Sequence, residues 1–357
     1  MEPFTIAIAD DVLADLRERL ERTRFVTPTA SGWDAGTDPA YLRSLVDYWA
    51  HDFDWRAAES RLNAYPQFRD RGQHFVHIRR DSSRPPVLLT HGWPSSFLEL
   101  LPLADRLDVD VVIPSLPGFL YSELPTGPLT RAAIAEGFHT LMTQSLGYDR
   151  YFAFGGDIGG SSIGWLATMY PDEVAGIHVI HGPFPADFDS SPITPAEQAF
   201  FDAEAERDEG DSGYSAIMST RPDTIAAALL DSPAGLAAWI IDKLHAWSDN
   251  GGDLESKFDR DTLCSMLTLY WATGSIGTSF RQYWDYPQNG ARPTIAVPVA
   301  VTQSNESDMR VFPRSIAERA ATDIRQYAEP DRGGHFLALE QPDLIAEQLG
   351  AFMRSVG

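Results

Sequence analysis

The chain has 357 residues, 43% of them hydrophobic and 22% charged, and this ordinary globular composition excludes collagen-like, low-complexity and wholly disordered classes of protein. The 51 Asp and Glu residues outnumber the 28 Lys and Arg residues, and the resulting net charge of −23 disfavours nucleic acid and anionic membrane surfaces as partners. The single cysteine, Cys264, excludes an intramolecular disulfide and a cysteine-based metal cluster.

The first 80 residues have the periodicity of helices. Apolar residues recur at three- and four-residue spacing over residues 13–20, and we expect Asp10 or Asp11 to cap that helix. A second segment of similar pattern covers residues 39–68. We expect residues 1–80 to form an N-terminal helical extension that packs on the core of the protein.

Short apolar runs of the strand type begin at residue 74, bounded by proline, glycine or charged residues as buried parallel strands commonly are. A helical segment over residues 161–170 separates two of them. Because strands that alternate with helices build sheets covered on both faces, we predict an α/β fold with a mostly parallel central sheet. The predicted strands are residues 74–78, 86–90, 110–114, 151–154 and 175–181.

The alternation of strands and helices stops between residues 183 and 290, where the pattern is helical. It resumes with predicted strands at residues 294–301 and 324–327 and a helix over residues 340–353. A helical insertion into a sheet domain is the economical interpretation. We therefore expect a core formed by residues 81–182 and 291–357, with a helical cap formed by residues 183–290.

The N-terminal residues lack the basic start and the apolar run of a secretion signal. The longest apolar stretch, residues 225–241, is interrupted by Asp231 and Pro233, so we do not expect it to span a membrane. Together with the acidic charge, these features predict a cytoplasmic protein with neither nucleic acid nor membrane as a partner, and they leave a homodimer open.

The run Gly155-Gly156-Asp157-Ile158-Gly159 lies between a predicted strand and a predicted helix. This is the context of a nucleophile elbow, with aspartate where hydrolases usually place serine, and its strained turn needs small neighbours. A carboxylate can displace a leaving group from a saturated carbon and form an ester that water later cleaves. The alternative is a glycine-rich turn in which Asp157 only caps the helix.

The loop His91-Gly92-Trp93-Pro94 follows the strand that ends at Thr90. In enzymes with such an elbow, this loop provides one amide of the oxyanion hole, and the residue after the nucleophile provides the other. We assign these two donors to the backbone N–H groups of Trp93 and Ile158. His91 is interpreted as a residue that packs the loop, not as a base.

The run Gly333-Gly334-His335-Phe336 lies after the last predicted strand and before the last predicted helix, the place where such hydrolases carry their base. The usual chain order of nucleophile, acid and histidine then requires a carboxylate after the strand at residues 294–301. The candidates are Glu306 and Asp308. His335 alone could be a surface histidine, but three elements in the right order favour a catalytic base.

With these motifs in view, the chain resembles the epoxide hydrolases of the α/β-hydrolase fold, specifically the microsomal-like branch with an N-terminal extension. The resemblance runs from about residue 4 to residue 353. Besides the three site motifs, it is carried by Asp54-Trp55-Arg56, Pro66-Gln67-Phe68, Gly213-Tyr214, Arg221-Pro222-Asp223-Thr224 and the run from Asp231 to Trp239.

The resemblance implies an enzyme that converts an epoxide to a vicinal diol and requires no metal or organic cofactor. It assigns the paired tyrosines of the family's cap to Tyr214 and Tyr283, and the family's acid to Asp308, with Glu306 as the second choice. Ring opening develops an alkoxide, which two phenols can hydrogen-bond and protonate. Without the resemblance, both tyrosines would be interpreted as packing residues. Ile158 is a departure, because many relatives have tryptophan there.

The predicted reaction has two steps, in which Asp157 attacks an epoxide carbon and water activated by His335 then hydrolyses the ester. The expected partners are water and a small, neutral, largely apolar epoxide. One alternative is a haloalkane dehalogenase, for which Trp93, Trp271 and Trp284 would supply halide donors. Another is a non-catalytic hydrolase-fold protein that binds a ligand.

Overall fold

In a computed structural model that describes residues 1–80, 82–188, 191–306 and 309–356, nine strands pair into one sheet. They are β1 (Glu2–Phe4), β2 (Gln67–Asp70), β3 (Gln73–Ile78), β4 (Val87–Thr90), β5 (Val111–Pro114), β6 (Tyr151–Gly155), β7 (Val174–Ile180), β8 (Val299–Thr302) and β9 (Ile324–Ala328). Their spatial order is β1-β2-β3-β5-β4-β6-β7-β8-β9. The pairs from β1 to β5 are antiparallel, and every pair from β5 to β9 is parallel, which confirms the predicted α/β class.

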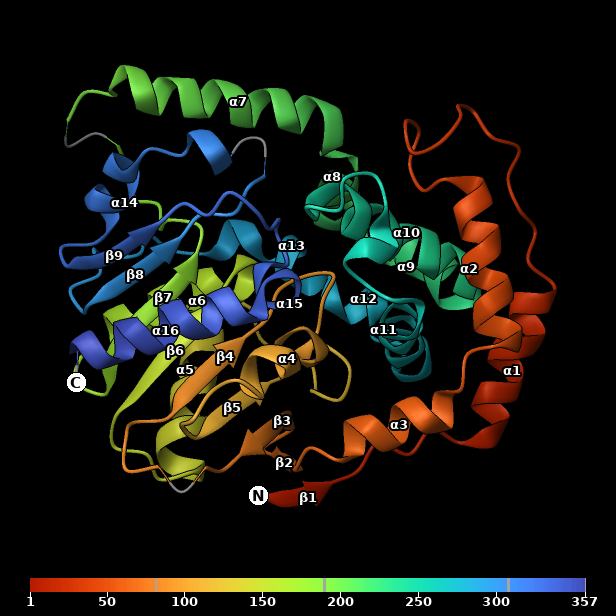
Figure 1. Cartoon of the computed structure of the whole chain (residues 1–357), viewed down its shortest axis with the longest axis horizontal. Coiled ribbons are helices and arrows are strands. Elements are labelled where there is room, and N and C mark those ends of the chain that lie inside the picture. The colour runs from red at the N-terminus through yellow and green to blue at the C-terminus, as the bar shows by residue number, and fades with distance from the viewer. Residues whose placement is uncertain (81, 189–190, 307–308, 357) are drawn as a thin grey trace.

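Helices cover both faces of this sheet, with α4 (Leu101–Ala104) and α16 (Pro342–Val356) on one side and α5 (Arg131–His139) and α6 (Asp157–Met169) on the other (Figure 1). The strands between them are buried on both faces, and this accounts for their continuous apolar runs. The remaining helices of the core are α14 (Arg314–Ala320) and α15 (Leu337–Glu340).

The cap consists of helices inserted between β7 and β8, and the described residues of that interval contain no strand. The helices are α7 (Pro195–Asp211), α8 (Gly213–Thr220), α9 (Pro222–Asp231), α10 (Pro233–Trp247), α11 (Arg260–Thr273), α12 (Ile276–Ser279) and α13 (Arg281–Trp284). In Figure 1, α7 lies apart from the group formed by α8 to α11.

Residues 1–80 differ from the expected all-helical extension, because β1 and β2 join the edge of the sheet. In the antiparallel pairing Glu2 lies opposite Arg69, and Phe4 lies opposite Gln67. These strands of three and four residues are too short to show a period. The partner of β1 lies more than 60 residues further along the chain, whereas β2 also pairs with the adjacent β3. The extension therefore supplies strands to the sheet as well as helices.

The helices of the extension, α1 (Asp10–Glu21), α2 (Pro39–His51) and α3 (Trp55–Asn63), pack on cap helices α10 and α11, although the sequence predicted packing on the core. Thr37 donates a hydrogen bond to the carbonyl of Ala238 over 2.7 Å, and the indole of Trp49 donates to Thr268 Oγ1 over 2.9 Å. The extension therefore joins the edge of the sheet to the cap.

The predicted cap of α1 is wrong in detail, since its N-cap residue is Ala9 and Asp10 and Asp11 lie in the first turn. Carboxylates at these positions still stabilise the helix, because they lie near the positive end of its dipole. Side-chain caps occur instead on α2 and α3, where Asp38 and Asp54 accept backbone N–H groups of the first turn.

The strand β8 begins at Val299, five residues later than predicted. Pro293 and Pro298 lack the N–H donors that a central strand needs, so Ile295 makes only an isolated bridge to Ala321. The end of this strand positions the loop that carries the candidate acids.

No single helix of the described chain is both long enough and apolar enough to cross a membrane. Only α9 and α10 taken together reach that length and composition, and they are bent by 119° relative to each other.

The bond between Trp49 and Thr268 gives a test of how the extension is attached to the cap. Both side chains are buried, so Thr268→Val leaves an indole N–H without an acceptor. We expect the free energy of unfolding to fall by about 1–3 kcal/mol in urea titrations. Thr262→Val in the same helix is the matched control and is expected to have little effect. Equal stability of the Thr268→Val variant and the unmodified protein would contradict this account.

Candidate active site

Asp157 lies on the turn between β6 and α6, in a left-handed conformation with φ of 51° that side chains rarely adopt. Three neighbouring positions have room only for glycine. A Cβ at Gly92 would lie 2.3 Å from Asp157 Oδ1, and a Cβ at Gly155 or Gly159 would lie 2.1 or 2.6 Å from atoms of Thr90. These close contacts with Thr90 and with the Asp157 side chain hold the strained Asp157 at the carboxyl end of the sheet, as the predicted elbow requires.

The backbone N–H of Trp93 donates a hydrogen bond to Asp157 Oδ1 over 2.9 Å. Ile158 is the second residue of α6, so its N–H belongs to the first turn, where amides have no acceptor within the helix. Both predicted oxyanion-hole residues therefore lie beside the carboxylate, and the first of them contacts it directly.

His91 packs the loop, as the sequence suggested. Its Nε2 accepts the N–H of Leu116 over 3.1 Å, and burial lowers the pKa of its imidazole to about 4. A neutral histidine engaged in this way stabilises the loop that carries Trp93.

His335 lies between two carboxylates. Its Nε2 is 3.8 Å from Asp157 Oδ2, and its Nδ1 is 3.4 Å from Glu306 Oε1. Glu306, the second choice of the sequence analysis, is therefore the candidate acid that contacts His335 among the described residues. The first choice, Asp308, lies outside the described residues.

A second histidine, His181, contacts the other oxygen of Glu306 and was missed by the sequence analysis. Its Nε2 lies 3.0 Å from Glu306 Oε2 and 2.8 Å from Ser304 Oγ. His181 directly follows β7 and has a φ of 67°, so its position at the carboxyl end of a central strand was the available signal.

His181, Glu306 and His335 are also the candidates for a metal site, because one donor atom from each lies within 4.8 Å of the others. In this structure the three groups pair with one another, and Glu306 bridges the two imidazoles. Such a bridge fixes both the position and the charge of the carboxylate.

The charges around His335 favour its protonated form. Burial disfavours the imidazolium, but the negative charges of Glu306, Asp157 and Glu99 outweigh burial and raise the pKa of His335 to about 9. Burial raises the pKa of Glu306, whereas the nearby His335 and His181 lower it. The two histidines outweigh burial and hold the pKa of Glu306 well below its usual range.

The loop that carries His335 is held by backbone hydrogen bonds to the cap and to α15. The N–H of His335 donates to the carbonyl of Trp247 over 2.7 Å, and Glu340 accepts the N–H groups of Gly334 and Phe336. A Cβ at Gly334 would lie 2.3 Å from the carbonyl oxygen of Trp247. The two glycines of the predicted motif are therefore explained in part by this tight contact with the end of α10.

Tyr214 on α8 and Tyr283 on α13 meet above Trp93, with their ring centroids 6.1 Å apart. The ring of Tyr214 stacks on Trp93 at 5.5 Å, and the ring of Tyr283 meets it edge-on at 5.9 Å. Burial, followed by the charge of Asp157, raises the pKa of both phenols. Both are therefore protonated at neutral pH and available as donors.

A buried lysine lies beside one of these phenols. The ammonium of Lys243 is 4.9 Å from the ring centroid of Tyr214, and it pairs with Asp211 and Asp242. Asp211 also accepts the indole N–H of Trp247 over 3.0 Å. These contacts join the end of α7 to α10 beside Tyr214.

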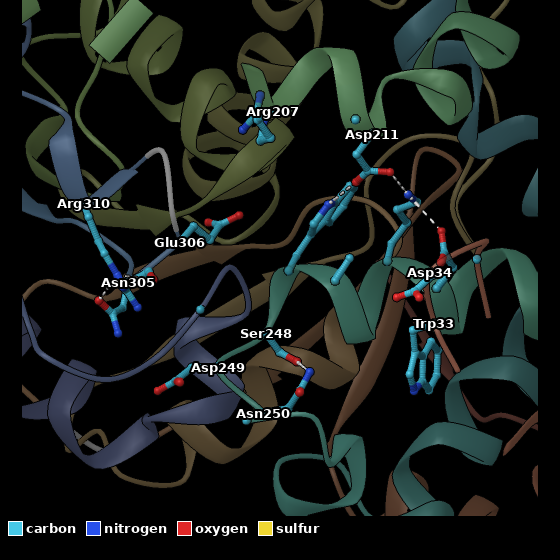
Figure 2. Close-up of a pocket in the computed structure, with 18 of the residues that line it drawn as sticks. Trp33, Asp34, Arg207, Asp211, Ser248, Asp249, Asn250, Asn305, Glu306 and Arg310 are labelled. Carbon is cyan, nitrogen blue, oxygen red and sulfur yellow. Dashed lines mark hydrogen bonds and ion pairs between the residues drawn. The ribbon is translucent and has the colours of Figure 1, made fainter. Parts of the chain in front are cut away.

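A cavity of about 200 Å³ lies over Asp157 and His335, between Tyr214, Trp247 and the end of α7. Its other walls are more polar than the expected apolar pocket, since Arg207, Asp208 and Asp211 contribute to them. Arg207, Asp211 and Glu306 also line an outer pocket of about 560 Å³ (Figure 2). Apolar surface is found next to it, in a third pocket lined by side chains that include Phe25, Leu42, Ala234, Trp239 and Tyr214.

The three tryptophans named for the dehalogenase alternative do not gather at the nucleophile. Trp93 is there, but Trp271 packs against Arg19 on α1, and Trp284 is 49% exposed. Within the described chain, a halide site built from these three indoles is therefore absent.

Comparisons with family models, related proteins and solved structures indicate the same family. The model of the epoxide hydrolase N terminus matches residues 1–100, and that of the alpha/beta hydrolase fold matches residues 85–213. Juvenile hormone epoxide hydrolase 2 of Ctenocephalides felis is 34% identical over 98% of this chain and 84% of its own length, and epoxide hydrolase 1 of Sus scrofa is 30% identical over 99% and 88%. The crystal structure of juvenile hormone epoxide hydrolase from the silkworm Bombyx mori matches with a TM-score of 0.89 at 28% identity, covering 100% of this chain and 95% of that one.

The charge on Asp157 is one cause of the high pKa of His335, and this can be measured. Asp157→Asn removes a negative charge 3.8 Å from Nε2, so the neutral imidazole is favoured and the pKa of His335 should fall from about 9. We expect a fall of about 1 or more in NMR titrations of labelled histidine. Asp343→Asn on the surface is the control, and an unchanged pKa in the Asp157→Asn variant would contradict the assignment.

Proposed function

This chain belongs to the epoxide hydrolase family of α/β-hydrolase-fold enzymes, and we propose that it opens its epoxide through a covalent ester on Asp157. One observation carries the proposal. The carboxylate of Asp157 lies between the amide of Trp93 and the imidazole of His335, with the rings of the two cap tyrosines packed against Trp93.

In the first step, Asp157 Oδ2 attacks an epoxide carbon, because Oδ1 is already held by the amide of Trp93. The carbon–oxygen bond of the ring breaks, and its electron pair moves to the ring oxygen. Tyr214 or Tyr283 donates a proton to that oxygen and becomes a phenolate. The products are a neutral hydroxyalkyl ester of Asp157 and the phenolate, which now carries the negative charge.

The charge of Asp157 couples nucleophilic attack to proton donation. That charge is one cause of the raised pKa of both phenols, and it disappears as the ester forms. A phenol therefore loses its proton more easily at the moment when the alkoxide needs one. The charge of Arg207 lowers the pKa of Tyr214 and so further favours a phenolate there.

In the second step, His335 takes a proton from water, whose oxygen attacks Cγ of Asp157. The amides of Trp93 and Ile158 stabilise the oxyanion, the alkyl–oxygen group leaves with the proton from His335, and the remaining proton restores the phenol. Loss of the charge on Asp157 lowers the pKa of His335 from about 9, so ester formation itself converts the imidazolium toward the neutral base. Glu306 orients Nδ1 and stabilises the imidazolium when it forms again.

The substrate that fits this proposal is a neutral epoxide with an apolar substituent. The cavity of about 200 Å³ accepts the oxirane and its nearest atoms, and the acidic walls disfavour an anionic group there. The adjoining apolar pocket, which reaches Tyr214, suits the rest of such a molecule.

The covalent step can be tested by trapping the ester. His335→Gln removes the base but leaves Asp157 intact, so we expect the ester to form and its hydrolysis to slow by about 100-fold or more. After mixing with a panel of neutral aryl and alkyl epoxides, intact mass spectrometry should show protein plus one substrate, with the added mass on Asp157.

The matched control is the double variant His335→Gln, Asp157→Asn, which should show no adduct. An active enzyme whose His335→Gln variant is slow but never carries an adduct would overturn the ester mechanism. Chloroalkanes in the same panel test the dehalogenase alternative, since this proposal predicts no halide release.

The choice of acid gives a separate prediction. Glu306→Gln removes the charge beside Nδ1 of His335, so the pKa of His335 should fall and ester hydrolysis should slow by about tenfold or more, measured as decay of the adduct. Asp308→Asn is the matched comparison two residues away, and this proposal expects a much smaller effect. The reverse order of effects would assign the acid to Asp308.

A further inference from the structure

A second, much smaller cavity lies on the core side of the nucleophile. Its volume is about 10 Å³, close to the space that one water molecule needs, and it cannot hold a substrate. Asp157 and His335 line this cavity as well as the larger one of about 200 Å³. The two cavities therefore meet at the pair of groups between which a water must act in ester hydrolysis.

Besides Thr90 and His91, two polar groups of the small cavity come from the segment after the Trp93 loop. Glu99 belongs to the short 3₁₀ turn Phe97–Leu100 and lines the cavity together with Ser95, whose hydroxyl favours the ionised form of its carboxylate. The hydroxyl of Ser95 is buried and forms no well-aligned hydrogen bond in the described chain. Buried polar groups normally have partners, and a buried water with two to four polar neighbours is the usual way to supply them.

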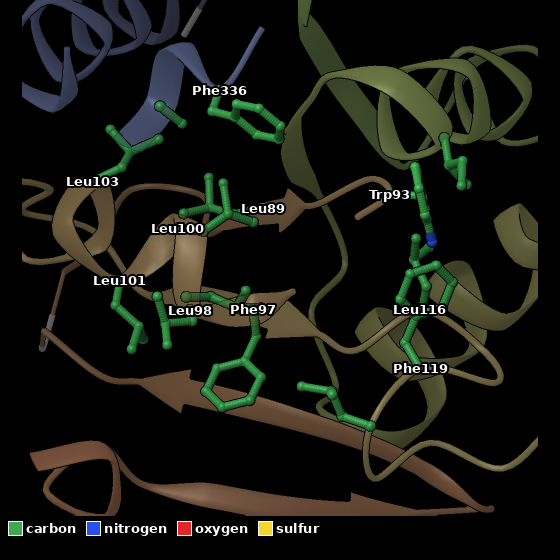
Figure 3. Packing of buried hydrophobic residues seen from close by; sticks show 14 of the residues in the cluster. Leu89, Trp93, Phe97, Leu98, Leu100, Leu101, Leu103, Leu116, Phe119 and Phe336 are labelled. Carbon is green, nitrogen blue, oxygen red and sulfur yellow. The ribbon is translucent and has the colours of Figure 1, made fainter. Parts of the chain in front are cut away.

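Apolar side chains separate this cavity from the protein surface. Leu100 and Phe336 belong to its lining, and Figure 3 shows Phe336 facing Leu89 and Leu100 across the packed interior. A water placed there would exchange through the active site and would be oriented by the few polar groups around it.

We propose that this cavity holds the water that hydrolyses the ester, and that Glu99 positions it. The inference rests on the proposed ester mechanism. The water donates one hydrogen to the Glu99 carboxylate and the other to His335 Nε2, and its oxygen lone pair is directed at Cγ of Asp157. During attack the oxygen–carbon bond forms and the proton moves to His335, while Glu99 keeps its hydrogen bond and gains no proton.

The electrostatics agree with this geometry. Burial raises the pKa of Glu99 to about 7. The charges of Asp157 and Glu340 also raise this pKa, whereas Ser95 and His335 lower it. Since ester formation removes the charge of Asp157, the carboxylate form of Glu99 becomes more favourable in the intermediate. Glu99 thus becomes a better hydrogen-bond acceptor in the step that needs it.

The test separates the two steps of the reaction. Glu99→Gln keeps the shape of the side chain but replaces one carboxylate oxygen by a donor, so we expect ester formation at the normal rate and ester hydrolysis slowed by about 10- to 100-fold. Rapid mixing with an epoxide that the enzyme turns over, followed by quenching and intact mass spectrometry, measures both steps. Glu99→Asp should recover part of the hydrolysis rate.

Two controls distinguish positioning from a structural effect. Glu123→Gln makes the same chemical change on an exposed side chain and should leave both steps unchanged. In addition, the hydrolysis rate of the unmodified enzyme should rise with pH as Glu99 ionises, and the Glu99→Gln variant should lose that part of the profile.

The results of these measurements distinguish the role of Glu99 from the ester mechanism. Adducts that form in the Glu99→Gln variant and decay at the normal rate would overturn the role of Glu99 and leave the mechanism intact. Equal slowing of both steps would indicate a structural role and would also overturn it. Absence of any adduct in this variant and in His335→Gln, with activity retained, would overturn the ester mechanism and this inference together.

Discussion

The contact between the loop after β4 and the turn after β6 is the constraint on which the whole site depends. Gly92 approaches Asp157 so closely that a Cβ would lie 2.3 Å from its Oδ1, and the same approach places the amide of Trp93 against that oxygen. The parallel neighbours β4 and β6 end at this point, so their pairing sets the distance between Gly92 and Asp157. The position of Asp157 is therefore fixed by close contacts at two neighbouring strand ends.

The parts of the site that local sequence could predict are those with a local cause. Asp157, Trp93 and His335 each lie in a glycine-containing loop beside a strand end, and the glycines reflect backbone contacts that no other residue permits. Because the family pattern fits only with one extra residue before the acid, the sequence could not decide between Glu306 and Asp308. A loop carries little periodicity to settle such a choice, and among the described residues Glu306 is the candidate that contacts the imidazole.

Other features have no local signature. Glu99 and His181 come from separate segments, and only the fold brings Glu99 to the cavity at Asp157 and His181 to Glu306, so each looked like an ordinary polar residue in the sequence. The strands β1 and β2 were missed because three or four residues show no period, and the partner of β1 lies more than 60 residues further along the chain. The helices of the cap, by contrast, were foreseen from composition and spacing over more than 100 residues.

The attachment of the N-terminal extension limits how the enzyme can admit a substrate. Its strands are part of the sheet, and its helices are bound to the cap through pairs such as Trp49 with Thr268 and Arg19 with Asp231. A cap tied in this way cannot swing off the core as a hinged lid unless these bonds break. Rotation of the whole cap would therefore cost the buried contacts between the extension and the cap, so the extension acts as a restraint on cap movement as well as a part of the sheet.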